Sequence, residues 1–387
     1  MIYLDSAATT FQKPLSVSYA MQRAMRTMSS PGRGGYAAAR AAEETAFRCR
    51  SLAAELFGVP SPEQVVFASN ATHALNIAIR SLVPEGGRVA VSGYEHNAVT
   101  RPLHALGARI KVAASPLFDR AALLRAFENS ISPELDAVVC THVSNVFGFV
   151  LPIEEIAALC RAEGVPLIVD ASQSAGILPF ELDTLGAAFI AMPGHKGLYG
   201  PQGTGLLLCR NGGQPLMQGG TGSNSADREM PDFLPDRLEA GTHNVCGIAG
   251  LAEGLRFVLR RTPEAIFAHE QRLLRRMYGV LEPMRGIRAF FGVPQAGVIS
   301  FVPETMDCEE AAQLLGQRGI AVRAGLHCAP VAHESAGTFA TGTVRLSFSA
   351  FNTEAEIARF AALCGKVFSG AGENPRIPTC YCGKNRI

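Results

Sequence analysis

The sequence predicts an α/β protein with a large, mostly parallel β-sheet and a second, smaller α+β unit. From about residue 60 to 210, short runs of β-branched and other apolar residues alternate with stretches whose apolar residues recur every three or four positions. This alternation of strands and helices is typical of a parallel sheet that is covered on both faces. Towards the C-terminus the elements follow in a different order, which favours a separate compact unit.

Each expected element follows from a short run of sequence. Strands of the large unit are expected at 64–69, 88–92, 109–113, 137–142, 167–170, 187–191 and 205–209, with helices between them, such as 72–82 and 153–163, and a longer one at 245–260. The smaller unit is expected to contain strands 298–302, 321–323 and 344–348 and helices 308–317 and 354–368. We therefore expect a large domain over 15–250, a small domain from 1–14 with 251–370, and a flexible cysteine-containing tail over 371–387.

The composition is that of a well-buried globular protein. Of the 387 residues 48% are hydrophobic and 18% are charged, and the net charge is +1. This charge offers no field to attract nucleic acid or an acidic membrane, so neither is expected as a partner. No secretory signal and no membrane-spanning apolar run is found. The ten cysteines lack the spacing of a disulfide scaffold, which favours the cytoplasm.

One lysine, Lys196, lies in a glycine-rich stretch directly after a predicted strand. Gly194 and His195 precede it, and glycines follow at 197, 200, 203 and 205. A lysine amine can form a Schiff base with a carbonyl carbon, and glycines let the backbone approach a bulky cofactor closely. A surface lysine in a loop is the alternative, and this stretch alone does not decide between the two.

Polar side chains also follow other predicted strands. Because ligands of open α/β sheets bind at the carboxyl ends of the strands, these side chains are candidates for one site. Backbone N–H groups at 71 and 72 and the Thr72 hydroxyl can hold a phosphate at the start of a helix, although a threonine there is also typical of a helix N-cap. His96 can stack on an aromatic ring, although a loop histidine without a role is common.

Two further strand ends complete the pattern. Asn145 can donate a hydrogen bond to a phenolic oxygen. Asp170 ends an apolar strand, where a carboxylate is costly to bury without a partner, and a protonated ring nitrogen would be such a partner. A phosphate seat, a stacking ring, a hydroxyl partner, a pyridinium partner and a Schiff-base lysine together indicate pyridoxal phosphate.

These residues belong to motifs that extend over nearly the whole chain, to about residue 368. The motifs are Leu4-Asp5-Ser6-Ala7-Ala8-Thr9-Thr10, Ser69-Asn70-Ala71-Thr72, Glu95-His96, Val143-Ser144-Asn145, Val169-Asp170-Ala171-Ser172-Gln173, Gly194-His195-Lys196, Glu239-Ala240-Gly241-Thr242, Arg323-Ala324-Gly325-Leu326-His327-Cys328-Ala329 and Val344-Arg345-Leu346-Ser347. With them the chain resembles the class V aminotransferase family, and within it the group II, SUF-type cysteine desulfurases, which include selenocysteine lyases. The resemblance implies the pyridoxal-phosphate-dependent transferase fold of type I, which is aspartate aminotransferase-like.

The resemblance also implies a role for each matching residue. Lys196 would hold pyridoxal phosphate as a Schiff base, and His96 would stack on its ring. Asp170 would pair with the ring nitrogen and Gln173 with the ring oxygen. Asn145 would lie near that oxygen and the substrate.

The remaining implied contacts concern the phosphate and the substrate. Ala71, Thr72 and His195 would contact the phosphate. Thr242 would reach the phosphate of the other subunit, which implies a homodimer with shared active sites. Arg345 would bind the substrate carboxylate through its guanidinium fork.

Cys328 lies beside His327 in a loop that begins with a glycine. Its thiolate could attack the sulfur of the substrate, and His327 with neighbouring cations could lower its pKa. A small buried cysteine is the common alternative, and the resemblance to the family outweighs it. A metal site of His327, Cys328 and His333 lacks a further ligand pair at zinc spacing, so no metal is expected.

The expected activity is that of a cysteine desulfurase, a sulfurtransferase. It would convert L-cysteine to L-alanine, leave a persulfide on Cys328, and pass the sulfur to an acceptor protein, for example for iron–sulfur cluster assembly. Lys196, Cys328 and His96 would be its catalytic residues. A selenocysteine lyase acting on L-selenocysteine, or another class V lyase or aminotransferase, is the alternative, and a non-enzymatic sulfur or metal carrier is a third reading.

Three places depart from the family pattern. Pro193 stands where relatives usually have a serine that helps to hold the phosphate. Gly32 and Tyr36 stand where relatives usually have histidines, so the substrate preference can differ. Cys380 and Cys382 in the tail are candidate sulfur acceptors or metal ligands, and an unstructured tail with incidental cysteines is the alternative.

Overall fold

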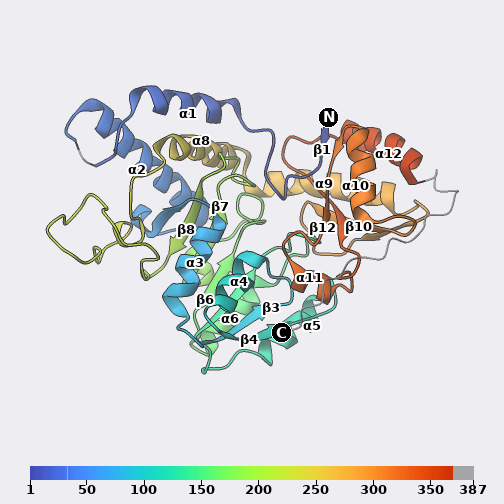
Figure 1. Ribbon diagram of the computed structural model, residues 1–387, viewed down its shortest axis with the longest axis horizontal. Helices are drawn as coiled ribbons and strands as arrows, with labels where there is room; N and C mark the ends of the chain where they lie inside the picture. The colour runs from blue at the N-terminus through green and yellow to red at the C-terminus, as the bar shows by residue number, and fades with distance from the viewer. Residues whose placement is uncertain (33, 369–387) are drawn as a thin grey trace.

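The structure is a computed structural model that describes residues 1–32 and 34–368, and it has two parts. In Figure 1 a large sheet with its covering helices fills the left and lower regions, and a smaller α+β part lies to the right. The expected tail over 371–387, with Cys380 and Cys382, lies outside the described residues. The domain boundaries expected from the sequence stay a prediction.

The large part is built on a seven-stranded sheet with the strand order β2-β8-β7-β6-β5-β3-β4. Strands β3 to β7 run parallel, whereas β8 is antiparallel to both of its neighbours. The strands are β2 (Val65–Ala68), β3 (Arg88–Ser92), β4 (Arg109–Ala113), β5 (Ala137–Thr141), β6 (Leu167–Asp170), β7 (Phe189–Pro193) and β8 (Gly205–Cys209). The mostly parallel α/β fold is therefore confirmed, and each expected strand forms within two residues of its expected ends.

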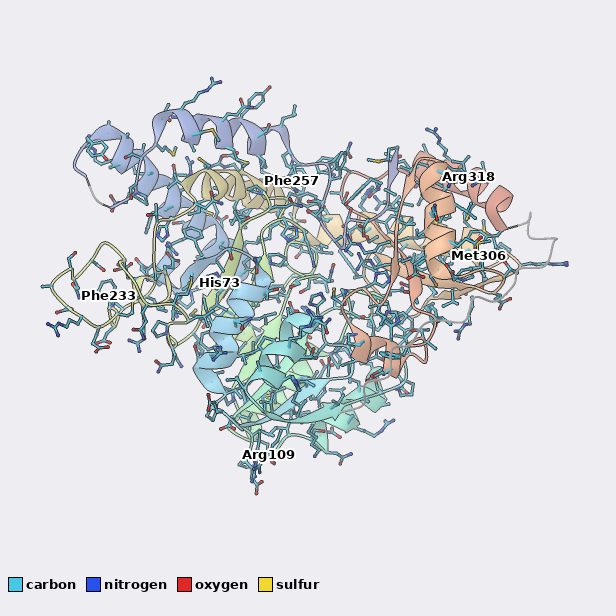
Figure 2. All side chains as sticks on the ribbon, in the orientation of Figure 1. His73, Arg109, Phe233, Phe257, Met306 and Arg318 are labelled. Atoms are coloured by element: carbon cyan, nitrogen blue, oxygen red, sulfur yellow. The ribbon has the colours of Figure 1, made fainter. Side chains whose placement is uncertain are left out.

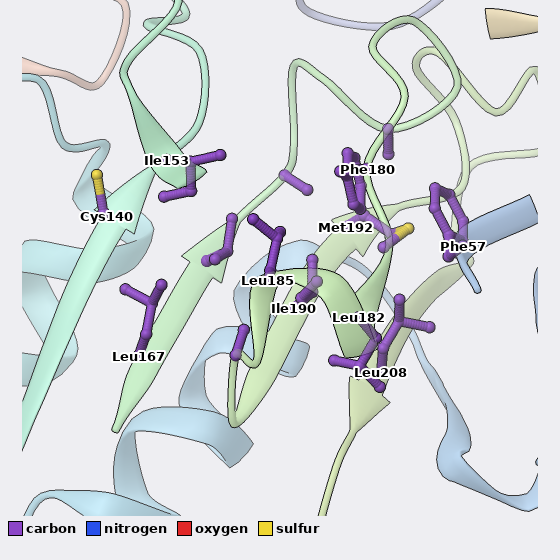
Figure 3. Packing of buried hydrophobic residues seen from close by; sticks show 14 of the residues in the cluster. Phe57, Cys140, Ile153, Leu167, Phe180, Leu182, Leu185, Ile190, Met192 and Leu208 are labelled. Atoms are coloured by element: carbon purple, nitrogen blue, oxygen red, sulfur yellow. The ribbon is translucent and has the colours of Figure 1, made fainter. Parts of the chain in front are cut away.

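Both faces of this sheet are buried, which explains its nearly continuous apolar strands. Successive residues alternate between the faces, so Val138 belongs to one core and Val139 to the other. Figure 3 shows part of the first core, where Ile190 and Leu208 from neighbouring strands lie with Leu182. The helices of the large part are α1 (Leu15–Thr27), α2 (Ala37–Phe57), α3 (Ala71–Leu82), α4 (Asn97–Ala105), α5 (Arg120–Glu128), α6 (Ile153–Ala162), α7 (Leu182–Leu185) and α8 (Val245–Arg261).

The smaller part has an antiparallel sheet with the strand order β12-β13-β10-β9 and a core of its own. Its elements are α9 (Pro263–Leu281), β9 (Ile287–Phe290), β10 (Val298–Pro303), α10 (Cys308–Gln317), β11 (Ile320–Ala321), β12 (Arg323–Gly325), α11 (Pro330–Ser335), β13 (Thr343–Ser347) and α12 (Glu354–Phe368). The N-terminal strand β1 (Ile2–Tyr3) pairs with β11, so the first residues of the chain belong to this part.

The prediction of a single strand over 321–323 is wrong, because two short strands form there. The chain changes partners at Val322, because β11 pairs with β1 whereas β12 pairs with β13. The two short strands therefore belong to different sheets. Pairing with an N-terminal strand more than 300 residues away leaves no signal in the local sequence.

An aromatic cluster joins the two parts near Lys196. Phe257 of α8, which Figure 2 labels where this helix approaches the smaller part, stacks on Phe351 with ring centroids 5.5 Å apart. Both rings meet Tyr199 edge-on, and the Tyr199 hydroxyl accepts a hydrogen bond from Ala350 N at 2.8 Å. The loop after Lys196 is thus anchored to both parts. Of the helices that the structure describes, none is long and apolar enough to cross a membrane.

Candidate active site

A cavity of about 210 Å³ opens at the carboxyl ends of the parallel strands. It lies where ligands of open α/β sheets bind. Most of the residues singled out in the sequence line it, namely Ala71, Thr72, His96, Asn145, Asp170, Gln173, His195 and Lys196. Three others, Thr242, Cys328 and Arg345, do not line it.

The N-terminus of α3 forms one wall of the cavity. Asn70 is the N-cap, because its side-chain oxygen accepts a hydrogen bond from His73 N at 2.9 Å. The alternative that Thr72 is the N-cap is therefore wrong. The Thr72 side chain is exposed and makes no hydrogen bond among the described residues. A helix N-terminus with a free hydroxyl beside it is suited to binding a phosphate.

His96 is held in one orientation on another wall. It is the N-cap of α4, and its Nδ1 accepts a hydrogen bond from Ala98 N at 3.0 Å. Burial lowers the pKa of His96 to about 4, so the imidazole is neutral and its proton resides on Nε2. A fixed, neutral ring is suited to stacking on an aromatic cofactor.

Asp170 and Lys196 provide the two opposite charges of the cavity. Asp170 ends β6 and is buried, and its Oδ1 accepts a hydrogen bond from Ser172 N at 2.9 Å. Its Oδ2 has no hydrogen-bond partner among the described residues, so one oxygen is free for a ligand. Burial lowers the pKa of Lys196 to about 8, while the charge of Asp170 acts in the opposite direction. The lysine amine is thus closer to its nucleophilic, unprotonated form than an ordinary lysine.

The N-terminal segment supports two other side chains of the cavity. Gln173 Nε2 donates a hydrogen bond to Ala7 O at 2.9 Å. His195 Nδ1 lies 3.1 Å from Thr9 Oγ1, and burial lowers the pKa of His195 to about 4. The Thr10 hydroxyl donates to the backbone oxygen of His195 at 3.1 Å. The N-terminal motif over residues 4–10 therefore orients side chains of the cavity. The sequence alone did not indicate this role.

Pro193 ends β7 and also lines the cavity. A proline has neither a side-chain hydroxyl nor a backbone N–H. The departure noted in the sequence thus lies at the site itself, and this position offers no donor to a phosphate.

Cys328 lies on a tight loop between β12 and α11. Its φ is 56° and that of His327 is 50°, a left-handed conformation that is uncommon for residues other than glycine. The loop is tied to the cavity walls, because Asn97 N donates to Cys328 O at 2.7 Å and Asn145 Nδ2 donates to His327 O at 2.8 Å. Cys328 is exposed, so the alternative of a small buried cysteine is wrong.

His327 is held by Thr343 at the start of β13, the strand that carries Arg345. Its ring is buried, with Nε2 3.0 Å from Thr343 O and 3.1 Å from Thr343 Oγ1. Burial lowers the pKa of His327 to about 2, so the ring is neutral and brings no positive charge to the thiol. The contacts of His327 with Thr343 thus hold the loop that carries Cys328.

Arg345 is close to the cavity but occupied. It is buried in β13, where Nη2 pairs with Asp5 Oδ1 at 2.8 Å and Nη1 donates to Asn145 O at 3.0 Å. Its Nε has no hydrogen-bond partner among the described residues. This Nε is buried, and the role of Arg345 toward a substrate carboxylate stays a prediction.

Thr242 is exposed and lines a different pocket, of about 290 Å³, together with Gly32. Its loop is held by Glu239, which forms a buried bidentate ion pair with Arg50 at 2.7 and 2.8 Å. Phe67 N also donates to Glu239 at 2.5 Å. Sequence reasoning missed Arg50, and an arginine within the apolar pattern of a helix was the signal that could have found it.

Sequence reasoning named Glu95 only as part of a motif and missed its structural role. It is fully buried beside His96, and it accepts hydrogen bonds from Thr141 N at 2.8 Å and from the Ser92 hydroxyl. Burial raises the pKa of Glu95 to about 8, which favours the neutral acid. Its carboxyl joins the ends of β3 and β5 and so fixes the loop that carries His96.

The similarity of this chain to known proteins agrees with the geometry of the site. The family model of class V aminotransferases matches residues 2–360, and the chain belongs to this family. A protein of Xylella fastidiosa (strain Temecula1) named probable cysteine desulfurase is 34% identical over 95% of this chain and 91% of its own length. A protein of the same name from Vibrio cholerae is 32% identical, with 95% and 93% covered. The chain spans 56% of the length of another such relative, from Mycolicibacterium paratuberculosis.

Two similar solved structures are those of cysteine desulfurases, which form one group within the family. The apo structure of a cysteine desulfurase from Thermococcus onnurineus has a TM-score of 0.87 and 28% identity, with 95% of both chains covered. A cysteine desulfurase from Escherichia coli has a TM-score of 0.84 and 26% identity, with 95% of this chain and 94% of the other covered. Enzymes of this kind generally depend on pyridoxal phosphate.

Proposed function

We propose that this protein is a pyridoxal-phosphate-dependent cysteine desulfurase that converts L-cysteine to L-alanine and forms a persulfide on Cys328. The observation that carries the proposal is one arrangement. Lys196 and Asp170 share a cavity with the α3 N-terminus. The exposed Cys328 lies on a loop that is hydrogen-bonded to Asn97 and Asn145 at the wall of that cavity.

The donor set of the cavity fits pyridoxal phosphate. The unpartnered Asp170 Oδ2 suits a protonated ring nitrogen, the Lys196 amine suits the aldehyde, and the α3 N-terminus with Thr72 suits the phosphate. The neutral ring of His96 would stack on the cofactor. When bound, the cofactor supplies an electron sink for the bond changes at the amino acid.

The residues of this chain would then perform three tasks. The Lys196 amine would take the proton from the α-carbon of cysteine, because a pKa of about 8 lets it exchange protons near neutral pH. Arg345 would bind the substrate carboxylate through its guanidinium group. The Cys328 thiolate would attack the substrate sulfur, so that an S–S bond forms, the C–S bond breaks, and the carbon skeleton takes up a proton and leaves as alanine.

The family resemblance further suggests the partners of the enzyme. We propose a homodimer in the cytoplasm with shared sites, in which Thr242 reaches the phosphate bound by the other subunit, and a protein that accepts the sulfur. The exposed position of Thr242, away from the cavity of its own chain, supports this arrangement.

Alanine formation from L-cysteine by the holoenzyme tests the proposal. The parent protein is expected to form alanine, and Cys328→Ala is expected to lose this activity with L-cysteine. Borohydride reduction is expected to fix the cofactor on Lys196. Undiminished activity of Cys328→Ala toward L-cysteine would contradict the proposal, and activity of that variant with L-selenocysteine alone would favour a selenocysteine lyase.

A further inference from the structure

Two arginines face each other on neighbouring strands beside the cavity. Arg323 of β12 is paired directly with Arg345 of β13 in the antiparallel register. Like charges directly opposite each other destabilise a sheet, so this pair requires a negative charge nearby. Asp5 supplies it, because its Oδ1 lies 2.8 Å from Arg345 Nη2 and its Oδ2 lies 3.2 Å from Arg323 Nε.

The N-terminal segment places Asp5 between the two arginines. A β-bridge joins Asp5 to Ser347 at the end of β13, and Ser347 N donates a hydrogen bond to Leu4 O at 2.8 Å. The Tyr3 hydroxyl donates to Asp5 O at 3.2 Å. The position of the carboxylate is therefore fixed by its own backbone as well as by the arginines.

The two arginines differ in their surroundings. The Arg345 side chain is 3% exposed, and its Nη1 donates to the backbone oxygen of Asn145, a residue that lines the cavity. The Arg323 side chain is 51% exposed, and Asp5 is its only ion-pair partner among the described residues. Arg345 thus lies at the wall of the cavity, whereas Arg323 reaches Asp5 from the surface of the protein.

The charges of these three side chains do not balance. Two guanidinium groups face one carboxylate, which leaves one positive charge in excess. An excess charge beside a buried group is costly unless a counter-ion compensates it. The carboxylate of an amino acid in the cavity would be such a counter-ion. Without Arg323, Asp5 alone would neutralise Arg345, and no excess charge would remain to attract it.

We propose that Arg323 is a positioning residue for the substrate, which neutralises Asp5 and so leaves the charge of Arg345 available to the carboxylate of the amino acid. The inference rests on the proposed function, because it requires an amino-acid substrate in the cavity. Arg323 touches neither the substrate nor the reacting atoms in this proposal. It therefore sets the affinity for the substrate and not the rate of the chemical steps.

The charges of the cluster also act on Lys196. Burial lowers the pKa of Lys196 to about 8, and Asp170 opposes this shift. Arg345 and Arg323 lower this pKa further, whereas Asp5 raises it. Loss of the Arg323 charge should therefore move the pH midpoint of pyridoxal phosphate uptake upward. A side chain with only a structural role would not be expected to shift this midpoint.

The experiment compares variants of the full-length enzyme loaded with pyridoxal phosphate. Arg323→Gln removes the charge and Arg323→Lys keeps it. Arg318→Gln is the matched control, because it removes an exposed arginine at the end of α10 in the same part of the fold (Figure 2). Alanine formation from L-cysteine gives kcat and KM. The absorbance of the cofactor measures the binding of L-alanine and of L-alaninamide, which lacks the carboxylate.

Arg323→Gln is expected to raise the KM for L-cysteine and the Kd of L-alanine about tenfold, because one nearby charge of favourable sign is lost. The kcat should stay nearly unchanged, and so should the Kd of L-alaninamide. Arg323→Lys and Arg318→Gln should both bind L-alanine as the parent does.

A double variant tests whether Arg323 acts through Asp5. In Asp5→Asn/Arg323→Gln one positive and no negative charge remain, which is the same excess as in the parent. The Kd of L-alanine should therefore lie closer to the parent value than that of Arg323→Gln alone. A Kd as high as that of the single variant would contradict an action through Asp5. The comparison of L-alanine with L-alaninamide does not depend on the stability of this double variant.

Equal affinity of Arg323→Gln and the parent for L-alanine would overturn the proposal. An equal loss of affinity for L-alanine and L-alaninamide would do the same, because Arg323 would then only support the fold. If the parent forms no alanine from L-cysteine, the proposed function fails instead, so the two failures are distinguishable.

Discussion

At the scale of single residues, the surroundings of Lys196 determine the pH range in which its amine can react. The protein lowers the pKa of this amine to about 8 by burial, and Asp170 opposes the shift. Below that pKa the amine carries a proton and cannot attack a carbonyl carbon. The reactivity of Lys196 toward an aldehyde should therefore change at a lower pH than that of an ordinary lysine, whose pKa is about 10.4.

This difference can be measured on protein freed of cofactor. The rate of pyridoxal phosphate uptake, followed by absorbance, is expected to rise about tenfold per pH unit and to level off above about pH 8. Asp170→Asn removes the opposing charge and should shift the midpoint to lower pH. The exposed Glu154→Gln on α6 serves as a control and should leave it unchanged. A rate that continues to rise to pH 10 would show that Lys196 is not perturbed.

At the scale of elements, the packing of α8 against the Lys196 loop supports the site. Gly254 of α8 has no room for a side chain, because a Cβ there would meet Leu198 O and lie 2.9 Å from Gly200 N. Gly254→Ala should push this loop away and destabilise the protein by about 1–3 kcal/mol.

Chemical denaturation and cofactor titration check this effect. Gly254→Ala is expected to lower both the free energy of unfolding and the affinity for pyridoxal phosphate. Gly279→Ala is the matched control, because a Cβ at that position of α9 meets nothing within 4 Å. The control should raise helix stability by about 0.5–1 kcal/mol without changing cofactor affinity. Equal effects of the two substitutions would contradict this account of the packing.

The N-terminal segment is held to β13 by a buried ion pair between Asp5 and Arg345. Asp5→Asn would leave the charge of Arg345 uncompensated, and breaking such a pair typically costs about 3–5 kcal/mol in the free energy of unfolding. Glu134→Gln removes the exposed partner of Arg88 and should cost less than about 1 kcal/mol. Urea denaturation of the three proteins measures the difference, and equal losses in the two variants would argue against a structural role of Asp5.

At the scale of the whole molecule, the proposed sharing of sites between subunits makes a prediction about mixed dimers. Lys196→Ala and Thr242→Ala should each impair alanine formation. Dissociating and reassociating a mixture creates dimers in which one site has both Lys196 and the partner's Thr242. The mixture is then expected to exceed the activity of either variant alone. Activity equal to the average of the two variants would speak against shared sites.

A feature of this protein could be predicted from the sequence only to the extent that it depends on a local pattern of residues. The strands and the residues at their ends, such as Asp170 and Lys196, were predictable because apolar runs and the topology rule bring strand ends together. The orientation of His327 was not, because a loop with left-handed backbone turns its ring toward Thr343. The contacts that Ala7 and Thr9 make with side chains of the cavity join residues that are 166 and 186 positions apart in the sequence. No local pattern encodes such contacts.

The central claim is that Cys328 accepts sulfur from L-cysteine. The most direct measurement is the mass of the Cys328 peptide after one equivalent of L-cysteine reacts with the holoenzyme in the absence of any thiol reductant or sulfur acceptor. We predict that this peptide gains one sulfur atom for each alanine formed and that the extra sulfur is removed by a thiol reductant. Alanine formation without any added sulfur on Cys328 would contradict the account.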